Sequence, residues 1–361
     1  MPHCLIIGGG VIGLMTAREL AQAGLQVTLL ERGQTGREAS WAAGGILSPL
    51  HPWHYPSAVN ALALWGQRRY AALAQELLDE TGIDPEYTRS GLLILDETEQ
   101  SAAQIWAGEH NTHLKSLDTG ALCTLEPELA PRPGSALLFP EVAQIRNPRL
   151  LQALKQSVLQ RGVVIEEDAA VSRLLIQVGH INGVETEHGR YQSDRVIIAG
   201  GAWSGTLLAG LGLGVQVTPM RGQMLLMQAP VGLVKHILSF QQRYIVPRHD
   251  GRLLIGSTLE QAGFDKSVTD EGLLQLKQFA ATLVPSLQDC QVEQHWAGLR
   301  PGSPQGVPYI GEHPRIKGLY ISTGHFRNGI VMAPGSAHLL ADILLNRQPI
   351  VNPSPYRPMV Q

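Results

Sequence analysis

Residues 4–13 read CLIIGGGVIG, a short apolar run that leads into Gly8-Gly9-Gly10-Val11-Ile12-Gly13, with the spacing G-x-G-x-x-G. Apolar residues then recur at helical spacing over 11–23, Gly24 ends that helix, and LQVTLL at 25–30 is typical of a second strand. The glycines allow a tight turn and let backbone N–H groups approach a pyrophosphate at the N-terminus of the helix. This stretch therefore predicts a dinucleotide-binding β–α–β unit.

Glu31 ends the second strand, 23 positions after Gly8. A carboxylate at this place can accept hydrogen bonds from a ribose hydroxyl, and it would repel a 2′-phosphate. Arg32, the next residue, leaves a 2′-phosphate cofactor open as an alternative. The motif by itself does not separate NAD from FAD, and a glycine-rich turn in another kind of α/β protein is the competing interpretation.

The composition narrows the class of protein. A chain of 361 residues predicts two domains, and a net charge of −3 gives no basic surplus for binding nucleic acid. Cys4, Cys123 and Cys290 are scattered, which indicates neither a disulfide framework nor a metal cluster and fits a reducing compartment. No secretory signal and no run of 18 apolar residues occurs, so we expect a soluble cytoplasmic enzyme without a membrane-spanning helix.

Three further segments bear on the cofactor: ASWAAGGI at 39–46, VIIAGGAWS at 196–204 and GHFRNGI at 324–330. Together with the N-terminal unit they resemble the FAD-dependent D-amino acid oxidase family. Within that family, WAGLRP at 296–301 and the GHFRNG segment are most similar to the glycine oxidases. The resemblance extends from about residue 4 to residue 345 and favours FAD over NAD.

The resemblance implies an α/β fold with a Rossmann-type FAD-binding domain, whose parallel sheet carries helices on both faces. A second, substrate-binding domain would contain a mixed or antiparallel sheet. Both domains would be discontinuous in sequence. The FAD-binding domain would comprise residues 1–84, 141–216 and 300–361, and the substrate-binding domain residues 85–140 and 217–299.

The resemblance also implies how FAD is held. The glycine loop would wrap the pyrophosphate, Glu31 and Arg32 would lie at the adenosine end, and Val171 would contact adenine through its backbone. The stretch 39–46 would lie along the diphosphate and flavin, and 325–331 at the N1–C2 edge of the isoalloxazine. The residues expected to bind FAD are Gly8, Gly10, Val11, Ile12, Gly13, Glu31, Arg32, Ala39, Ser40, Ala43, Gly44, Gly45, Val171, Gly200, Trp203, His325, Phe326, Arg327, Asn328, Gly329, Ile330 and Val331.

The segment from Gly324 to Gly329 also has a physical reason to lie beside a flavin. It leaves a strand and opens a helix, and a helix N-terminus carries about half a positive charge. That charge would stabilise the negative charge that a reduced flavin accumulates at N1–C2=O. An ordinary strand-to-helix turn is the competing interpretation. No cysteine lies in or beside this segment, so we expect non-covalent, dissociable FAD.

An amino acid substrate offers a carboxylate, which a guanidinium can bind through two hydrogen bonds. Because the chain has 22 Arg and 6 Lys, an arginine needs a distinctive setting to be informative. Arg300 follows the apolar WAGL run and precedes Pro301-Gly302, which predicts a turn. The resemblance implies that Arg300 binds the substrate carboxylate; a structural salt bridge is the alternative.

Two further residues complete the substrate site that the resemblance implies. The Tyr244 hydroxyl would be a second donor to the carboxylate, unless this is simply a half-buried strand tyrosine. Arg327 would line the site near the substrate, or it could face a phosphate or the flavin. No catalytic protein base is expected if the amine binds in its neutral form. His51 and His54, in HPWHYP, have no third ligand at metal spacing, so no metal site is expected.

The implied reaction is oxidative deamination of glycine, sarcosine or D-alanine by hydride transfer to flavin N5. Dioxygen would be reduced to hydrogen peroxide, glycine would yield glyoxylate and ammonia, and the imine would supply thiamine thiazole synthesis. The resemblance suggests a homotetramer, with no nucleic-acid partner and no stable membrane association. One alternative is a D-amino acid dehydrogenase that passes electrons to a membrane quinone. Another is a flavoprotein that uses FAD only for stability.

Overall fold

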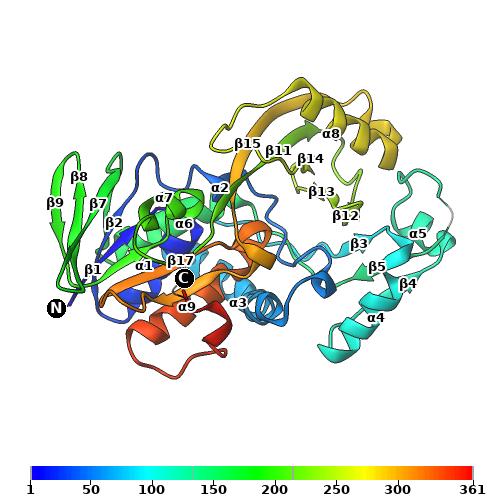
Figure 1. Cartoon of the computed structure of the whole chain (residues 1–361). Coiled ribbons are helices and arrows are strands. Elements are labelled where there is room, and N and C mark those ends of the chain that lie inside the picture. Colours follow the sequence, from blue (N-terminus) through cyan, green and yellow to red (C-terminus); the bar gives the residue numbers. More distant parts are fainter. Residues whose placement is uncertain (1, 133, 214, 360–361) are drawn as a thin grey trace.

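The computed structural model describes residues 2–132, 134–213 and 215–359 (Figure 1). Residues 1, 133, 214 and 360–361, which fall inside the expected domain ranges, lie outside the described residues. The helices are α1 (Val11–Gln22), α2 (Ala39–Ala42), α3 (Ser57–Thr81), α4 (Gln100–Glu109), α5 (Thr119–Leu125), α6 (Asn147–Gln160), α7 (Ser204–Leu208), α8 (Asp270–Leu283) and α9 (Gly329–Leu344). The strands are β1 (His3–Ile7), β2 (Gln26–Leu30), β3 (Leu92–Ile94), β4 (Lys115–Leu117), β5 (Ala136–Phe139), β6 (Val164–Glu166), β7 (Val171–Gln177), β8 (His180–Thr186), β9 (Gly189–Gln192), β10 (Val196–Ile198), β11 (Thr218–Gln228), β12 (Ile237–Phe240), β13 (Arg243–Pro247), β14 (Arg252–Gly256), β15 (Val292–Gly302), β16 (Tyr309–Glu312) and β17 (Leu319–Thr323).

The first sheet has the strand order β16-β17-β10-β1-β2-β6. Its strands pair in parallel, apart from β16, which runs antiparallel to β17 at the edge. Successive side chains of β1 point to opposite faces, so Cys4 and Ile6 pack with α1, α3 and α9, while Leu5 and Ile7 pack on the other face. This confirms a Rossmann-type α/β fold.

The second face of this sheet differs from the expectation of helices on both sides. It is covered by the antiparallel sheet β7-β8-β9 together with the short helix α7. Ile181 and Val184 of β8 and Leu208 of α7 are buried against it. The physical reason is local, because Val178 and Gly179 both have positive φ and form a tight turn that closes β7 and β8 into a hairpin rather than a helix.

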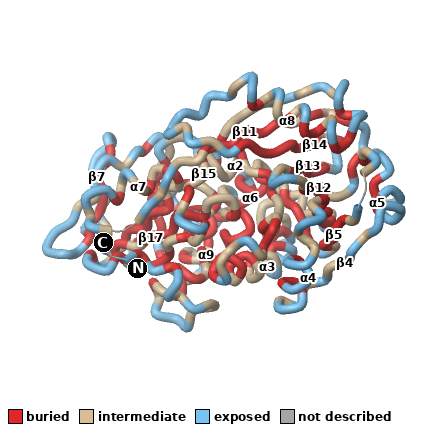
Figure 2. The backbone as a smooth tube through the Cα atoms, turned by 45° about the vertical axis from the view of Figure 1, so that its right-hand side comes forward, coloured by how far each residue is buried: buried red, intermediate tan, exposed pale blue. Residues whose placement is uncertain are grey.

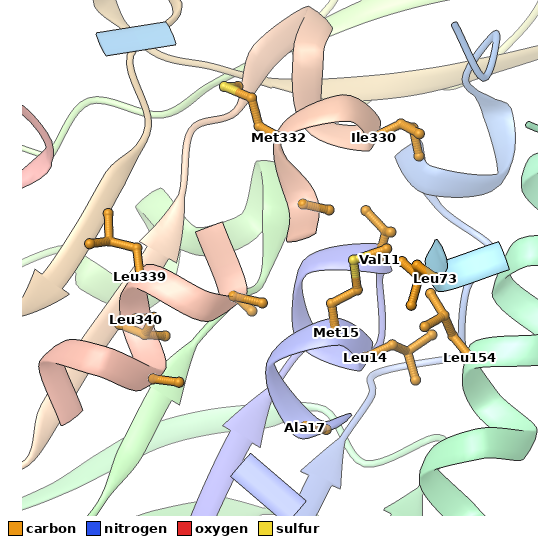
Figure 3. Packing of buried hydrophobic residues seen from close by; sticks show 14 of the residues in the cluster. Val11, Leu14, Met15, Ala17, Leu73, Leu154, Ile330, Met332, Leu339 and Leu340 are labelled. Atoms are coloured by element: carbon orange, nitrogen blue, oxygen red, sulfur yellow. The ribbon is translucent and has the colours of Figure 1, made fainter. Parts of the chain in front are cut away.

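Helices α1, α3 and α9 pack together beneath the glycine loop. Figure 3 shows Val11, Leu14 and Met15 of α1 beside side chains of α9. Pro334 lies inside α9 and has no N–H, so the carbonyl of Ile330 loses its helical donor. The Tyr70 hydroxyl of α3 donates to that carbonyl at 2.5 Å and replaces the missing bond. This contact ties the first turn of α9 to α3.

The second sheet has the order β15-β11-β14-β13-β12-β3-β5-β4. All neighbours are antiparallel except β12 and β3, which are parallel, so the predicted mixed sheet is confirmed. One face packs against α8 and the other around Trp106 of α4. Figure 2 shows buried backbone through the middle of the molecule and exposed segments along its outer rim. In Figure 1, β11 and β15 reach from this sheet toward α2.

Candidate active site

A cavity of 370 Å³ is lined by residues of both large sheets. From the first sheet it receives the carboxyl ends of β1, β2, β10 and β17, where parallel α/β sheets bind their ligands. From the second sheet it receives parts of β11, β13 and β15. The expected site residues that line it are Gly8, Gly10, Val11, Ile12, Glu31, Arg32, Ala39, Ser40, Ala43, Gly44, Val171, Gly200, Trp203, Tyr244, Arg300, His325, Phe326, Arg327, Gly329 and Ile330.

Four expected cofactor residues are not among those lining that cavity. Gly45, Asn328 and Val331 line an adjoining cavity of 260 Å³, which shares Tyr244, Arg300 and Arg327 with the first. Gly13 lies behind the loop, where a Cβ would collide with the carbonyl of Gly8. The third glycine of the motif therefore allows close packing of helix on strand rather than contact with a ligand.

The glycine loop fits a diphosphate. Gly8 has φ +111°, and a Cβ there would lie 2.5 Å from the Ala199 oxygen, so only glycine is tolerated without displacing the chain. In the first turn of α1, the Val11 N–H donates to Ser40 Oγ at 2.9 Å. The N–H group of Ile12 has no acceptor within the helix, because the first turn has no preceding carbonyls. This amide and the helix dipole favour an anion.

Glu31 is held at the end of β2 by two backbone amides. Its carboxylate is 7% exposed and accepts from the N–H of Gly9 at 2.6 Å and of Gly33 at 3.1 Å. Because a carboxylate has about four lone-pair positions, it can still accept from a ribose hydroxyl in the cavity. The side chain is therefore preorganised rather than free to rotate.

Arg32 lies beside Glu31 and is already partnered. Its Cζ lies 3.5 Å from the centroid of the Trp203 ring, and its Nη2 lies 2.9 Å from Glu38 Oε1. Glu38 lines the cavity but was not expected from the sequence, because no motif marks it. Its charge compensates Arg32, which weakens the alternative of a 2′-phosphate cofactor.

The GHFRNG segment links β17 to α9 through Gly324, with φ +82°, and a short 3-10 turn at Phe326–Asn328. The buried His325 side chain lies against α9, with Nε2 3.0 Å from Ser336 Oγ. Burial lowers the pKa of His325 to about 3, so the imidazole is neutral and unsuited to act as a base. The first turn of α9, at Gly329 and Ile330, lines the cavity.

Arg300 has only neutral partners among the described residues. Nη2 donates to Ser257 Oγ at 2.7 Å and Nη1 to the Thr258 carbonyl at 3.2 Å, and no carboxylate lies within ion-pair distance. Desolvation lowers the pKa of Arg300 from its ordinary value. The structural salt bridge that the sequence left open is thus not found in the described part of the chain, and the guanidinium is available to an anion.

The expected turn after Arg300 is wrong. Strand β15 continues through Pro301 to Gly302, with Pro301 opposite Pro219 of β11. A proline is tolerated here because β15 is the edge strand of the sheet, where one row of N–H groups needs no partner. Arg300 therefore projects from within a strand, not from its end.

Tyr244 and Arg327 lie beside Arg300 in both cavities. Tyr244 is buried, and its hydroxyl lies 3.5 Å from Met224 Sδ. Arg327 donates from Nη1 to Gln242 Oε1 at 3.0 Å and from Nη2 to the Gln242 carbonyl at 3.1 Å. The hydrogen-bond partners of Arg300 and Arg327 are thus neutral groups, and no carboxylate of the described residues pairs with either guanidinium.

Two strand glycines that sequence reasoning did not single out make room for neighbouring groups, Gly222 for Arg300 and Gly298 for α2. Gly222 and Gly298 lie directly opposite each other in the β11–β15 pair. A Cβ at Gly222 would collide with the Arg300 guanidinium, and one at Gly298 would lie 2.5 Å from Ala42 Cβ. A glycine inside a strand often marks such a close approach, so this signal was present in the sequence.

The loop histidines line the smaller cavity. His51 Nε2 lies 3.7 Å from Asp96 Oδ2, and His54 Nε2 lies 3.1 Å from Glu99 Oε2. Within the described ranges, no three His, Cys, Asp or Glu side chains come together as a metal site. Over the same residues, no helix is long and apolar enough to cross a membrane.

The comparisons with known proteins agree with this geometry. The chain is 49% identical to the glycine oxidase of Pseudomonas aeruginosa over 98% of both chains. It is 34% identical to the Synechocystis protein named Bifunctional protein ThiO/ThiG, over 95% of this chain and 52% of that one. The crystal structure of glycine oxidase from Geobacillus kaustophilus superposes with a TM-score of 0.94 at 32% identity, covering 99% of each chain. The DAO model, described as FAD dependent oxidoreductase, matches residues 3–343, so the chain belongs to this family of FAD-binding oxidoreductases.

Proposed function

We propose that the protein oxidises glycine to an imine, which water converts to glyoxylate and ammonia. The observation that carries the proposal is the Arg300 guanidinium, which has no carboxylate partner among the described residues and lies in one cavity with the glycine loop and the first turn of α9. Similarity to proteins named glycine oxidase over nearly the whole chain supports the same substrate.

In this proposal the first sheet and its helices hold FAD, and the second sheet supplies the substrate site, following the division expected from the sequence. The FAD-binding residues are those expected above, except that Gly13 acts through packing. When bound, FAD would supply the hydride acceptor at flavin N5, with dioxygen as the final oxidant and hydrogen peroxide as its product.

The protein contributes binding and orientation. The fork of Arg300 donates two charge-assisted hydrogen bonds to the substrate carboxylate, and the Tyr244 hydroxyl donates a third. Arg327 adds positive charge near the same group. The neutral amine needs no protein base, because its lone pair forms the C=N bond of an iminium as hydride leaves the α-carbon. The iminium then releases a proton to water to give the imine. Catalysis is then mainly positioning in a partly dry site.

Sarcosine and D-alanine are proposed as further substrates, and bulky D-amino acids as poor ones. We also propose that the imine supplies thiamine thiazole synthesis. The relative named Bifunctional protein ThiO/ThiG supports this, because the region similar to this chain makes up 52% of a relative whose name gives it two functions. Faster oxidation of D-phenylalanine or D-proline than of every small amine would instead indicate a general D-amino acid oxidase.

The test is an anaerobic titration of the purified holoprotein with glycine, followed by oxygen uptake. Glycine should bleach the flavin absorption band, and air should restore it with release of hydrogen peroxide. Bleaching without oxygen uptake, but with reduction of an added quinone, would favour the D-amino acid dehydrogenase. No bleaching by any small amine would leave a non-catalytic flavoprotein.

Three finer properties belong to the same proposal. FAD should be non-covalent, because none of Cys4, Cys123 and Cys290 lines either cavity in the described structure. Acid precipitation should therefore release the flavin into the supernatant; flavin in the pellet would mean covalent attachment. Light scattering should give a homotetramer, and cell fractionation should place the protein in the cytoplasm.

A further inference from the structure

The segment 257–269 joins β14 to α8 and reaches across to the first sheet. At its start, Ser257 and Thr258 hold the Arg300 guanidinium. Further along, the Phe264 ring stacks on Trp203, with centroids 5.6 Å apart and an interplanar angle of 26°. One segment of the second sheet thus touches both the substrate side and the Glu31 end of the cavity.

Lys266 makes a second contact with that end. Its Nζ lies 3.1 Å from Glu38 Oε1, the same oxygen that lies 2.9 Å from Arg32 Nη2. Because Arg32 also lies over the Trp203 ring, the contacts of Phe264 and Lys266 reach the same cluster, which consists of Arg32, Glu38 and Trp203. Arg32, Glu38 and Trp203 all line the cavity, whereas Phe264 and Lys266 lie outside it.

The segment is anchored independently of these contacts. Arg221 of β11 binds Asp265 Oδ2 at 2.8 Å and Glu260 Oε2 at 2.5 Å. Phe264 nevertheless stays 48% exposed, so it contributes little to a hydrophobic core. The Phe264 ring is therefore positioned by its stacking on Trp203 and not by burial in a core.

We propose that Phe264 and Lys266 are positioning residues that clamp the adenosine end of FAD by fixing Arg32, Glu38 and Trp203. The ligand is the adenosine part of the dinucleotide, and the clamp slows its departure. The inference rests on the proposed orientation of FAD, with the adenosine at Glu31 and Arg32. The clamp also gives a reason why the segment 257–269, whose first residues contact Arg300, extends to the cofactor side of the cavity.

The test compares FAD binding to apoprotein prepared from Phe264→Ala, Lys266→Gln and the double variant. Loss of one stacked ring or one exposed ion pair should raise the FAD dissociation constant roughly three- to tenfold, with faster flavin release. Phe264→Tyr keeps the ring and should bind FAD like the wild type. Lys277→Gln removes a lysine of α8 that has no ion pair among the described residues, and it should change nothing.

Thermal melting separates a clamp from a merely structural role. The variants should lower the melting temperature of the FAD-bound protein and leave that of the apoprotein unchanged. An equal decrease in both forms would overturn the proposal. Glu31→Ala distinguishes the remaining outcomes. If it weakens FAD binding while Phe264→Ala and Lys266→Gln do not, the clamp is wrong. If Glu31→Ala also leaves FAD binding unchanged, the orientation of FAD is wrong.

Discussion

The two sides of the cavity are built in different ways. The glycine-loop side is centred on one continuous stretch, Cys4 to Glu31, which residues at the ends of β10 and β17 complete, and it offers mainly backbone amides and a helix end. The arginine side brings Tyr244, Arg300 and Arg327 from β13, β15 and the β17–α9 link, and offers side chains held by neutral partners. The glycine-loop side depends on the close approach of backbone amides to a ligand. The arginine side depends on single side chains whose positions are set by strand pairing. Substitutions should therefore separate cofactor binding from substrate turnover.

The largest separation should come from Arg300→Ala. Without the guanidinium the substrate carboxylate is desolvated and unpaired, so kcat/KM for glycine should fall. The decrease should correspond to a rise of about 3–5 kcal/mol in activation free energy. FAD content should stay near that of the wild type, because other segments hold the flavin. Arg300→Lys should recover only part of the activity, because one point charge cannot reproduce the fork.

Steady-state kinetics with flavin quantified for each variant measure this. A wild-type KM for glycine in Arg300→Ala would show that the carboxylate is held elsewhere, with Arg327 the next candidate. Loss of flavin or of folding in Arg300→Ala would mean that Arg300 also supports cofactor binding or the fold, so that cofactor binding and substrate turnover cannot be separated by this substitution.

Glu31→Ala should give the converse result. It removes the proposed ribose acceptor and leaves the N–H groups of Gly9 and Gly33 without their partner. Loss of a charge-assisted hydrogen bond costs about 1.5–3 kcal/mol, so FAD affinity should fall roughly ten- to hundredfold. Fluorescence titration of the apoprotein with FAD measures it. At saturating FAD the KM for glycine should be close to wild type, and a large change in KM would contradict the separation.

Gly222→Ala tests whether the arginine side depends on the room around Arg300. The added methyl collides with the guanidinium, and such overpacking costs about 1–3 kcal/mol. We expect a higher KM for glycine with normal FAD affinity. Gly108→Ala, where a Cβ meets nothing within 4 Å, is the matched control and should behave as wild type. Weaker FAD binding in Gly222→Ala would show that the crowding is transmitted to the cofactor side.

The smallest effect concerns His325, which lines the cavity and whose buried side chain contacts Ser336 of α9. Its pKa is about 3 in the folded protein and about 6.5 when unfolded, so the unfolded state binds the extra proton between these values. Stability should therefore fall as the pH decreases from 6.5 toward 3, with a contribution of about 1 kcal/mol at pH 5.5.

Denaturant unfolding of the wild type and His325→Gln at pH 7 and pH 5.5 measures this contribution. The loss of stability between the two values should be smaller in the variant. An unchanged difference would mean that the imidazole is already protonated in the folded protein.

Much of the cofactor side could be predicted from the sequence, because a β–α–β unit brings its own residues together through local geometry. The glycine loop, Glu31 and the strand-to-helix link at 324–329 all lie where the sequence indicated. Arg300, Tyr244 and Arg327 were identified through resemblance to a family, not through spacing. The place of the β7–β8 hairpin over the second face of the first sheet was not predicted, since helices were expected there.

Sequence alone thus determined which segments we propose as the dinucleotide site, since backbone amides at a helix N-terminus need only a short, continuous motif. Tertiary structure alone decided the rest. The extension of β15 past Pro301, the neutral partners of Arg300 and the pairing of Lys266 with Glu38 all depend on contacts between distant parts of the chain. Such contacts follow from strand register and the packing of two sheets, and no local pattern of residues encodes them.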